Sequence, residues 1–123
     1  MIPILLTVLL GAYAPETGIT SLSVAPASDR TEVLIHVDGD VSIKSFSLTN
    51  PHRVVLDISG ARQGLALEFS DINRGGVTGM RVGQYQRDVV RVVVDLAQSV
   101  EFDVAHNGTE IRVSFPNPAG GFE

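Results

Sequence analysis

Residues 53–58 (RVVLDI) and 91–96 (RVVVDL) have nearly the same sequence, and their residue pattern is the main basis for predicting the fold. Side chains alternate between the two faces of a β-strand, so each stretch would place its Arg and Asp on one face and three large aliphatic residues on the other. A strand buried on both faces would be more uniformly apolar, so the pattern predicts half-buried strands with one face in solvent. The charged side chains expected on that face are Arg53, Asp57, Arg91 and Asp95.

The rest of the chain has a similar sequence pattern, in which short Val- and Ile-rich runs are separated by Gly, Pro, Asn, Asp and Ser. Such spacing is typical of an all-β sandwich or barrel. No stretch keeps a 3.6-residue apolar period, so we expect little helix. Strands are expected at residues 19–25, 32–38, 41–48, 53–58, 77–83, 88–96, 99–105 and 110–115. Residues 65–69 (LALEF) could form a further short strand.

The eight expected strands divide into two sets of four that can be aligned. The matched pairs are GITSLSV (18–24) with GVTGMRV (76–82), VLIHVD (33–38) with VRVVVD (90–95), and TNPHRVVLDI (49–58) with HNGTEIRVSF (106–115). Alternating β segments share a period of two whatever their origin, so a duplication and a chance similarity both stay open. On this alignment RVVLDI and RVVVDL are not copies of each other. Their matching Arg and Asp are therefore attributed to function.

Composition limits the remaining choices. A chain of 123 residues fits one domain, and the absence of cysteine excludes disulfides and thiolate metal sites. The net charge is −5 and the single lysine is Lys44, so the sequence lacks the basic surface that binds nucleic acid phosphates.

The N-terminus predicts export. Residues 2–10 form an apolar run of signal-peptide length, and Ala12-Tyr13-Ala14 matches the small-x-small cleavage pattern. A buried apolar strand or helix of the domain is the alternative. We therefore expect a signal peptide at 1–14, a domain at 15–116, and a Pro/Gly-rich linker at 117–123 that leads to a downstream region.

Three motifs together resemble the AMIN domain: NPHRVVLDISG (50–60), GVTGMRVGQYQRDVVRVVVDL (76–96) and EFDVAHNGTEIRVSF (101–115). This module precedes the catalytic domain of some periplasmic N-acetylmuramoyl-L-alanine amidases and lies near the N-terminus of type IV pilus secretins. The positions that match the family pattern are Asn50, Pro51, Arg53, Asp57, Arg81, Gln84, Arg91 and Asp95. The resemblance implies a β-sandwich of two similar four-stranded sheets, with these motifs on the outer faces.

The resemblance also implies peptidoglycan binding in the periplasm or cell envelope. Peptidoglycan offers N-acetyl groups, hydroxyls and stem-peptide carboxylates, and an arginine fork can bind a carboxylate through two hydrogen bonds. We expect Arg53, Arg81 and Arg91 to contact carboxylates or carbonyls, and Gln84, Asp57 and Asp95 to orient them or to bind hydroxyls. Tyr85 could stack on a sugar face. The alternative is a purely structural role, in which these Arg and Asp residues only form surface ion pairs.

No catalytic motif accompanies this pattern. His36, His52 and His106 are scattered without zinc-ligand spacing, and the sequence has no nucleophile elbow, phosphate-binding glycine loop or Ser-x-x-Lys. The expected protein is therefore a non-enzyme without a cofactor.

Several readings of the parent protein stay open. We expect the N-terminal part of a type IV pilus secretin, with the targeting domain of a cell-wall amidase as the alternative. Such a parent could be oligomeric and membrane-associated. The same sandwich could instead dock a pilus or secretion component through an edge strand, or serve as a sugar-binding module of an exported enzyme.

Overall fold

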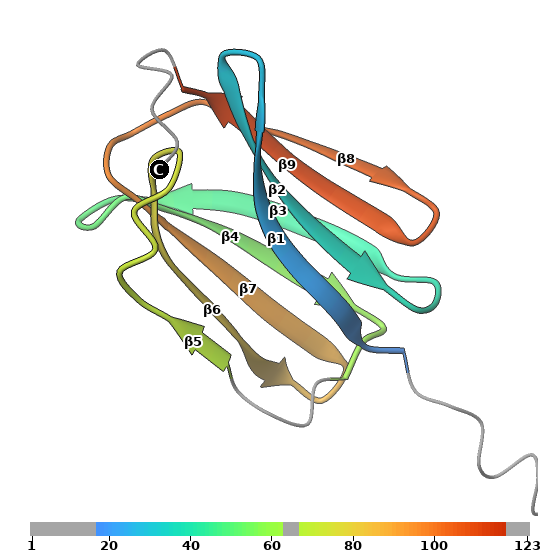
Figure 1. Cartoon of the computed structure of the whole chain (residues 1–123). Coiled ribbons are helices and arrows are strands. Elements are labelled where there is room, and N and C mark those ends of the chain that lie inside the picture. The colour runs from blue at the N-terminus through green and yellow to red at the C-terminus, as the bar shows by residue number, and fades with distance from the viewer. Residues whose placement is uncertain (1–16, 63–66, 118–123) are drawn as a thin grey trace, which may run out of the picture.

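The computed structural model describes residues 17–62 and 67–117, and Figure 1 shows them as two stacked β-sheets. The strands are β1 (Ile19–Ala27), β2 (Arg30–Val37), β3 (Ser42–Leu48), β4 (Arg53–Ser59), β5 (Leu67–Phe69), β6 (Val77–Gln86), β7 (Val89–Leu96), β8 (Asp103–Asn107) and β9 (Glu110–Pro116). Among the described residues, no helix has the length and apolar character needed to cross a membrane. The expected signal peptide and most of the expected linker lie outside the described residues.

Both sheets are antiparallel. One sheet has the strand order β1-β2-β9-β8, and the other has the order β3-β4-β7-β6-β5. The expected all-β sandwich is confirmed. The second sheet has five strands because β5, the short strand foreseen at 65–69, pairs with β6 at its edge. The strand expected at 99–105 begins later, at Asp103.

The core lies between the sheets and follows the alternation of the sequence. Val54, Leu56 and Ile58 of β4 are almost completely buried, as are the alternate valines of β7. The facing sheet contributes the alternate aliphatic residues of β2 and β9. Thr31 is a buried polar exception, and its hydroxyl donates a 2.7 Å hydrogen bond to the carbonyl of Gly75. A period of two therefore determines which side chains fill this core.

The two halves of the chain are arranged alike. Hairpin β1–β2 lies in the four-stranded sheet and hairpin β3–β4 in the five-stranded one, whereas β6–β7 and β8–β9 take the opposite sheets. The first hairpin of each half has a bulge at the same place, after Ile19 in β1 and after Val77 in β6. The sequence alignment pairs these two residues. A shared irregularity is a stronger sign of duplication than a shared period.

The alignment of the second strands was wrong by two residues. Leu22 lies opposite Ile35, and its counterpart Met80 lies opposite Val94, so Ile35 corresponds to Val94 and not to Val92. The cause is a second bulge in hairpin β6–β7, between Gln84 and Gln86. The inserted residue is Tyr85, which has no counterpart in hairpin β1–β2. The second hairpin is therefore one residue longer than the first, where the sequence alignment had made it one residue shorter.

Candidate ligand-binding face

The two similar stretches are neighbours in the middle of the five-stranded sheet. β4 and β7 run antiparallel, with Arg53 opposite Asp95 and Asp57 opposite Arg91. Each strand has Arg near its start and Asp near its end, so the antiparallel arrangement places opposite charges across from one another. Cross-strand pairing therefore accounts for the charges of Asp57 and Arg91, whereas Arg53 and Asp95 are opposite in register without forming an ion pair with each other.

Arg91 and Asp57 form the tightest contact on this face. Nε of Arg91 donates to Oδ1 of Asp57 at 2.8 Å, and the NH2 nitrogen donates to Oδ2 at 2.9 Å. The side chains are 28% and 15% exposed, so the pair is partly shielded from water. The hydrogen bonds from Arg91 hold the pKa of Asp57 below its ordinary value, and Lys44 adds to that effect. The contact with Asp57 raises the pKa of Arg91.

The other two expected arginines are held differently. Arg81 extends from β6 and donates to Asp95 at 3.1 Å, so Asp95 is paired with Arg81 and not with Arg53 opposite to it. Arg53 donates to the backbone carbonyl of Pro51 at 2.7 Å. Its side chain forms no ion pair with another of the described residues.

Tyr85 covers the guanidinium of Arg91. The centre of its ring lies 3.5 Å from Cζ of Arg91, and the ring of Phe46 on β3 lies 5.6 Å away. A β-bulge can change the direction in which a side chain points, and Tyr85 lies at such a bulge. The tyrosine is still 51% exposed, so much of its surface is available to a ligand. The cation–π contact joins Arg91 and Tyr85 into one ridge on the sheet, which we call the Tyr85 ridge.

Two grooves flank the Tyr85 ridge, and both are lined partly by Tyr85 and Arg91. The apolar groove has a volume of about 360 Å³ and a mostly apolar lining that includes Val93 and Gly83, with Arg81 and Glu68 at its border. The polar groove has a volume of about 440 Å³ and a mostly polar lining. Its main lining residues besides the ridge are Lys44, Phe46, Asp57, Ser59 and Gln86. Both volumes fall in the range of small-molecule sites.

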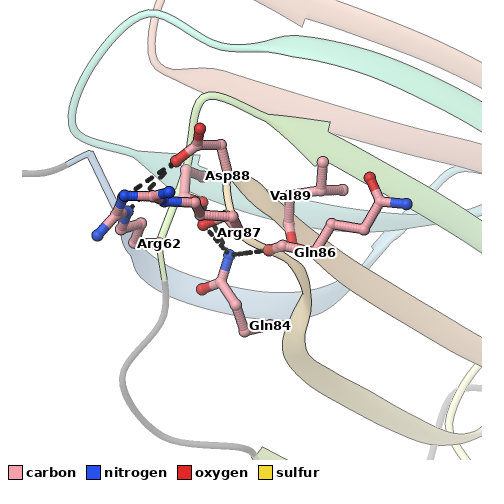
Figure 2. A network of polar contacts seen from close by, with 7 residues as sticks. Arg62, Gln84, Gln86, Arg87, Asp88 and Val89 are labelled. Atoms are coloured by element: carbon pink, nitrogen blue, oxygen red, sulfur yellow. Dashed lines mark hydrogen bonds and ion pairs between the residues drawn. The ribbon is translucent and has the colours of Figure 1, made fainter.

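Gln84 is part of the lining of the apolar groove, together with Arg81 and Arg91, but it does not share their face of the sheet. It is opposite the buried Val90, so its side chain belongs to the inner side of the sheet. Figure 2 shows its amide nitrogen within the turn between β6 and β7, where it lies 2.9 Å from the carbonyl of Gln86 and 3.1 Å from that of Val89. It also reaches the carbonyl of Ala61 at 3.2 Å. Gln84 therefore closes the hairpin that carries Tyr85.

The outer face of the five-stranded sheet is less exposed to solvent than the sequence predicted. Val55 faces outward between Phe46 and Val93, yet it is only 2% exposed. Phe46, Lys44, Glu68 and Gly83 also shape the face but were not among the expected site residues. For Phe46 and Lys44 a signal existed, because they alternate along 42–48 as outward positions of an edge strand.

The outer face of the four-stranded sheet differs in charge. By the structural equivalence, Glu32 stands where the other sheet has Arg91, and Glu110 stands where it has Arg53. Arg112 lies within 3.6 Å of Glu32 and 3.1 Å of Glu110. The acidic residues of this face therefore disfavour an anionic ligand, whereas the five-stranded sheet carries more cations than carboxylates.

Residues 17–62 and 67–117 contain no cluster of three His, Asp or Glu side chains suited to a metal ion. His36 lies on β2 beside Glu110, His52 lies in the turn before β4, and His106 lies on β8.

The domain is an all-β sandwich in which Arg53, Asp57, Arg81, Arg91 and Asp95 share the outer face of one sheet. Residues 21–116 match the AMIN domain family, and the chain belongs to that family. A curated relative is N-acetylmuramoyl-L-alanine amidase AmiC from Escherichia coli O6:H1 (strain CFT073), which is 31% identical over 102 residues. The match covers 79% of this chain and 24% of the relative, so the chain spans about a quarter of that protein's length.

Proposed function

We propose that this domain binds peptidoglycan through the outer face of the five-stranded sheet and thereby localises an exported cell-envelope protein. The observation that supports this most is convergence: Arg53, Asp57, Arg81, Arg91 and Asp95 come from three strands yet lie on one face. The family assignment agrees with this role, since AMIN domains are non-catalytic targeting modules. Periplasmic location and the absence of catalysis in this domain belong to the same proposal.

The grooves provide the means of binding. Tyr85 presents an aromatic surface to a sugar ring, while arginine N–H groups bind carbonyls or carboxylates. Because Arg81 and Arg91 already donate to Asp95 and Asp57, each Asp orients its arginine and keeps the charge of the face nearly balanced. Gln84 contributes to the proposed site by fixing the turn beside Tyr85. Binding to one domain would be weak, and an oligomeric parent would gain avidity on a repeating polymer.

The parent protein remains part of the proposal. The similarity to AmiC supports an amidase in which this domain directs a separate catalytic domain to the cell wall. A type IV pilus secretin is the other parent that we propose. In both parents the domain would serve the same localising role, and docking of pilus or secretion components would be additional to it.

Co-sedimentation with purified peptidoglycan sacculi tests this proposal. The intact domain is expected to pellet with sacculi, and combined replacement of Arg53, Arg81 and Arg91 by Ala should leave it in the supernatant. The matched control replaces Arg30 and Arg112, which lie on the outer face of the other sheet, and should still pellet. Circular dichroism establishes that each variant is folded. Failure of the intact domain to pellet would refute peptidoglycan binding.

A further inference from the structure

We propose that the site recognises the junction of glycan and stem peptide, with the sugar in the apolar groove and the peptide in the polar groove. This inference rests on the proposed peptidoglycan binding and makes it more specific. Its basis is that the two grooves differ in chemistry but share Tyr85 and Arg91, so one ligand can occupy both by crossing the Tyr85 ridge.

The apolar groove suits an N-acetylated sugar. Its lining includes Val93 and one side of Tyr85, and Gly83 leaves space where a larger residue would fill the groove. Sugar C–H groups and acetyl methyl groups pack well on such surfaces. Arg81 and Glu68 border the groove and can donate to and accept from hydroxyl and amide groups at its rim. A mostly apolar lining that also includes Arg81 and Glu68 therefore matches a sugar better than it matches a charged peptide.

The polar groove suits the carboxylate of a stem peptide. Both carboxylate oxygens of Asp57 accept hydrogen bonds from Arg91, so that charge is already neutralised within the domain. Lys44 lies opposite Asp57 on β3, is exposed, and forms no ion pair with another described residue. It is the single lysine of the chain and lies in the lining of this groove. Its ammonium is thus the cation left to bind an incoming carboxylate.

The ridge links the two halves of the ligand. A peptidoglycan unit consists of an amino sugar joined to a peptide, and Tyr85 and Arg91 line both the apolar and the polar groove. A glycan without peptides would occupy the apolar groove alone, and a free peptide would occupy the polar groove alone. Because two linked contacts cooperate, the joined unit should bind better than either part.

Competition for intact sacculi tests this inference with the full chain. The competitors are a disaccharide-peptide, the same disaccharide without peptide, and the free stem peptide. We expect the disaccharide-peptide to displace the domain at a concentration at least about tenfold lower than either part alone. Lys44→Gln should raise the required disaccharide-peptide concentration about fivefold, which corresponds to one exposed ion pair, and leave competition by the disaccharide unchanged.

Three further variants complete the design. Gly83→Val, which fills the apolar groove, should weaken competition by the disaccharide and spare that by the free peptide. If this variant fails to fold, Arg81→Gln probes the same groove. Arg30→Gln is the charge-matched control for Lys44→Gln and should change neither curve.

The possible outcomes separate the two proposals. If the domain pellets but the bare disaccharide competes as well as the disaccharide-peptide, or if Lys44→Gln has no effect, the junction inference is wrong and peptidoglycan binding stands. If the domain does not pellet with sacculi, both proposals fail.

Discussion

Removing the Arg91–Asp57 pair should reveal a coupling that ordinary surface ion pairs lack. The two hydrogen bonds measure 2.8 and 2.9 Å, and the side chains are only 28% and 15% exposed. Exposed pairs contribute about 0.2–1 kcal/mol, and hydrogen bonds to charged groups about 1.5–3 kcal/mol. For this partly shielded pair we expect a coupling free energy of about 1–2 kcal/mol. For a domain of this size each kcal/mol corresponds to about 4–8 °C in Tm.

A double-mutant cycle measures this coupling. The unfolding free energies of the wild type, Asp57→Ala, Arg91→Ala and the double variant are obtained by urea titration followed by circular dichroism. The matched control is the Arg30–Asp103 pair, which has a 3.2 Å contact and side chains 36% and 86% exposed. Its coupling should be at most about 0.5 kcal/mol. Equal coupling in the two cycles would refute the argument from burial and geometry.

The same cycle should depend on pH in a defined direction. Hydrogen bonds from Arg91 lower the pKa of Asp57 from its ordinary 3.8, so the folded state keeps the carboxylate charged where the unfolded chain protonates it. The contribution of the ion pair to the stability of the folded state is therefore fully present well above pH 3.8. It is lost as the pH falls through the lowered folded-state pKa of Asp57. Coupling that persists at the same size in acid far below pH 3.8 would show that the interaction is not ionic.

Three pairs of substitutions test other parts of the fold by chemical denaturation. Gln84→Ala should lower the unfolding free energy by about 1–2 kcal/mol because the β6–β7 turn loses its side-chain donor, and Gln84→Glu should cost more because it brings an acceptor to carbonyl groups. Thr31→Val should cost about 1–2 kcal/mol because it leaves the buried carbonyl of Gly75 without its donor, whereas Thr31→Ser should retain most of the stability. Leu56→Ala should cost about 2–5 kcal/mol as a cavity in the core, while Leu48→Ala, at a side chain 40% exposed, should cost far less; similar losses would contradict the assigned core.

The charge reversal gives the two sheets different outer surfaces, although each sheet contains strands from both halves of the chain. The inner residues of β2 and β7 are all aliphatic or Thr, because both pack in the same core. On the outside, Glu32 and Arg91 occupy equivalent places with opposite charge. Core packing restricts the inner positions of both halves, whereas solvent-facing positions can diverge. One face could thus become a binding site while the other remained a surface of ion pairs.

The fold class and the composition of the core could be predicted from local sequence patterns alone. Alternation with a period of two needs only local backbone geometry, so it assigned Val54, Leu56 and Ile58 to the core and Arg53 and Asp57 to the outside. The same local information located nearly all of the strands and suggested that the chain is built from two similar halves.

Which charged side chains form ion pairs and which residues form grooves depends on how the strands pair in the tertiary structure. Pairing of β4 with β7 joins residues more than thirty positions apart, such as Arg91 and Asp57, and no local pattern specifies that register. The bulge at Tyr85 also depends on the pairing of β6 with β7, because a residue counts as inserted only when the partner strand has no residue opposite it. Sequence grouped Gln84 with the arginines, but this bulged hairpin turns it inward and leaves Tyr85 over Arg91. The candidate site is therefore a product of strand register, which arises only when the two halves of the chain pack together.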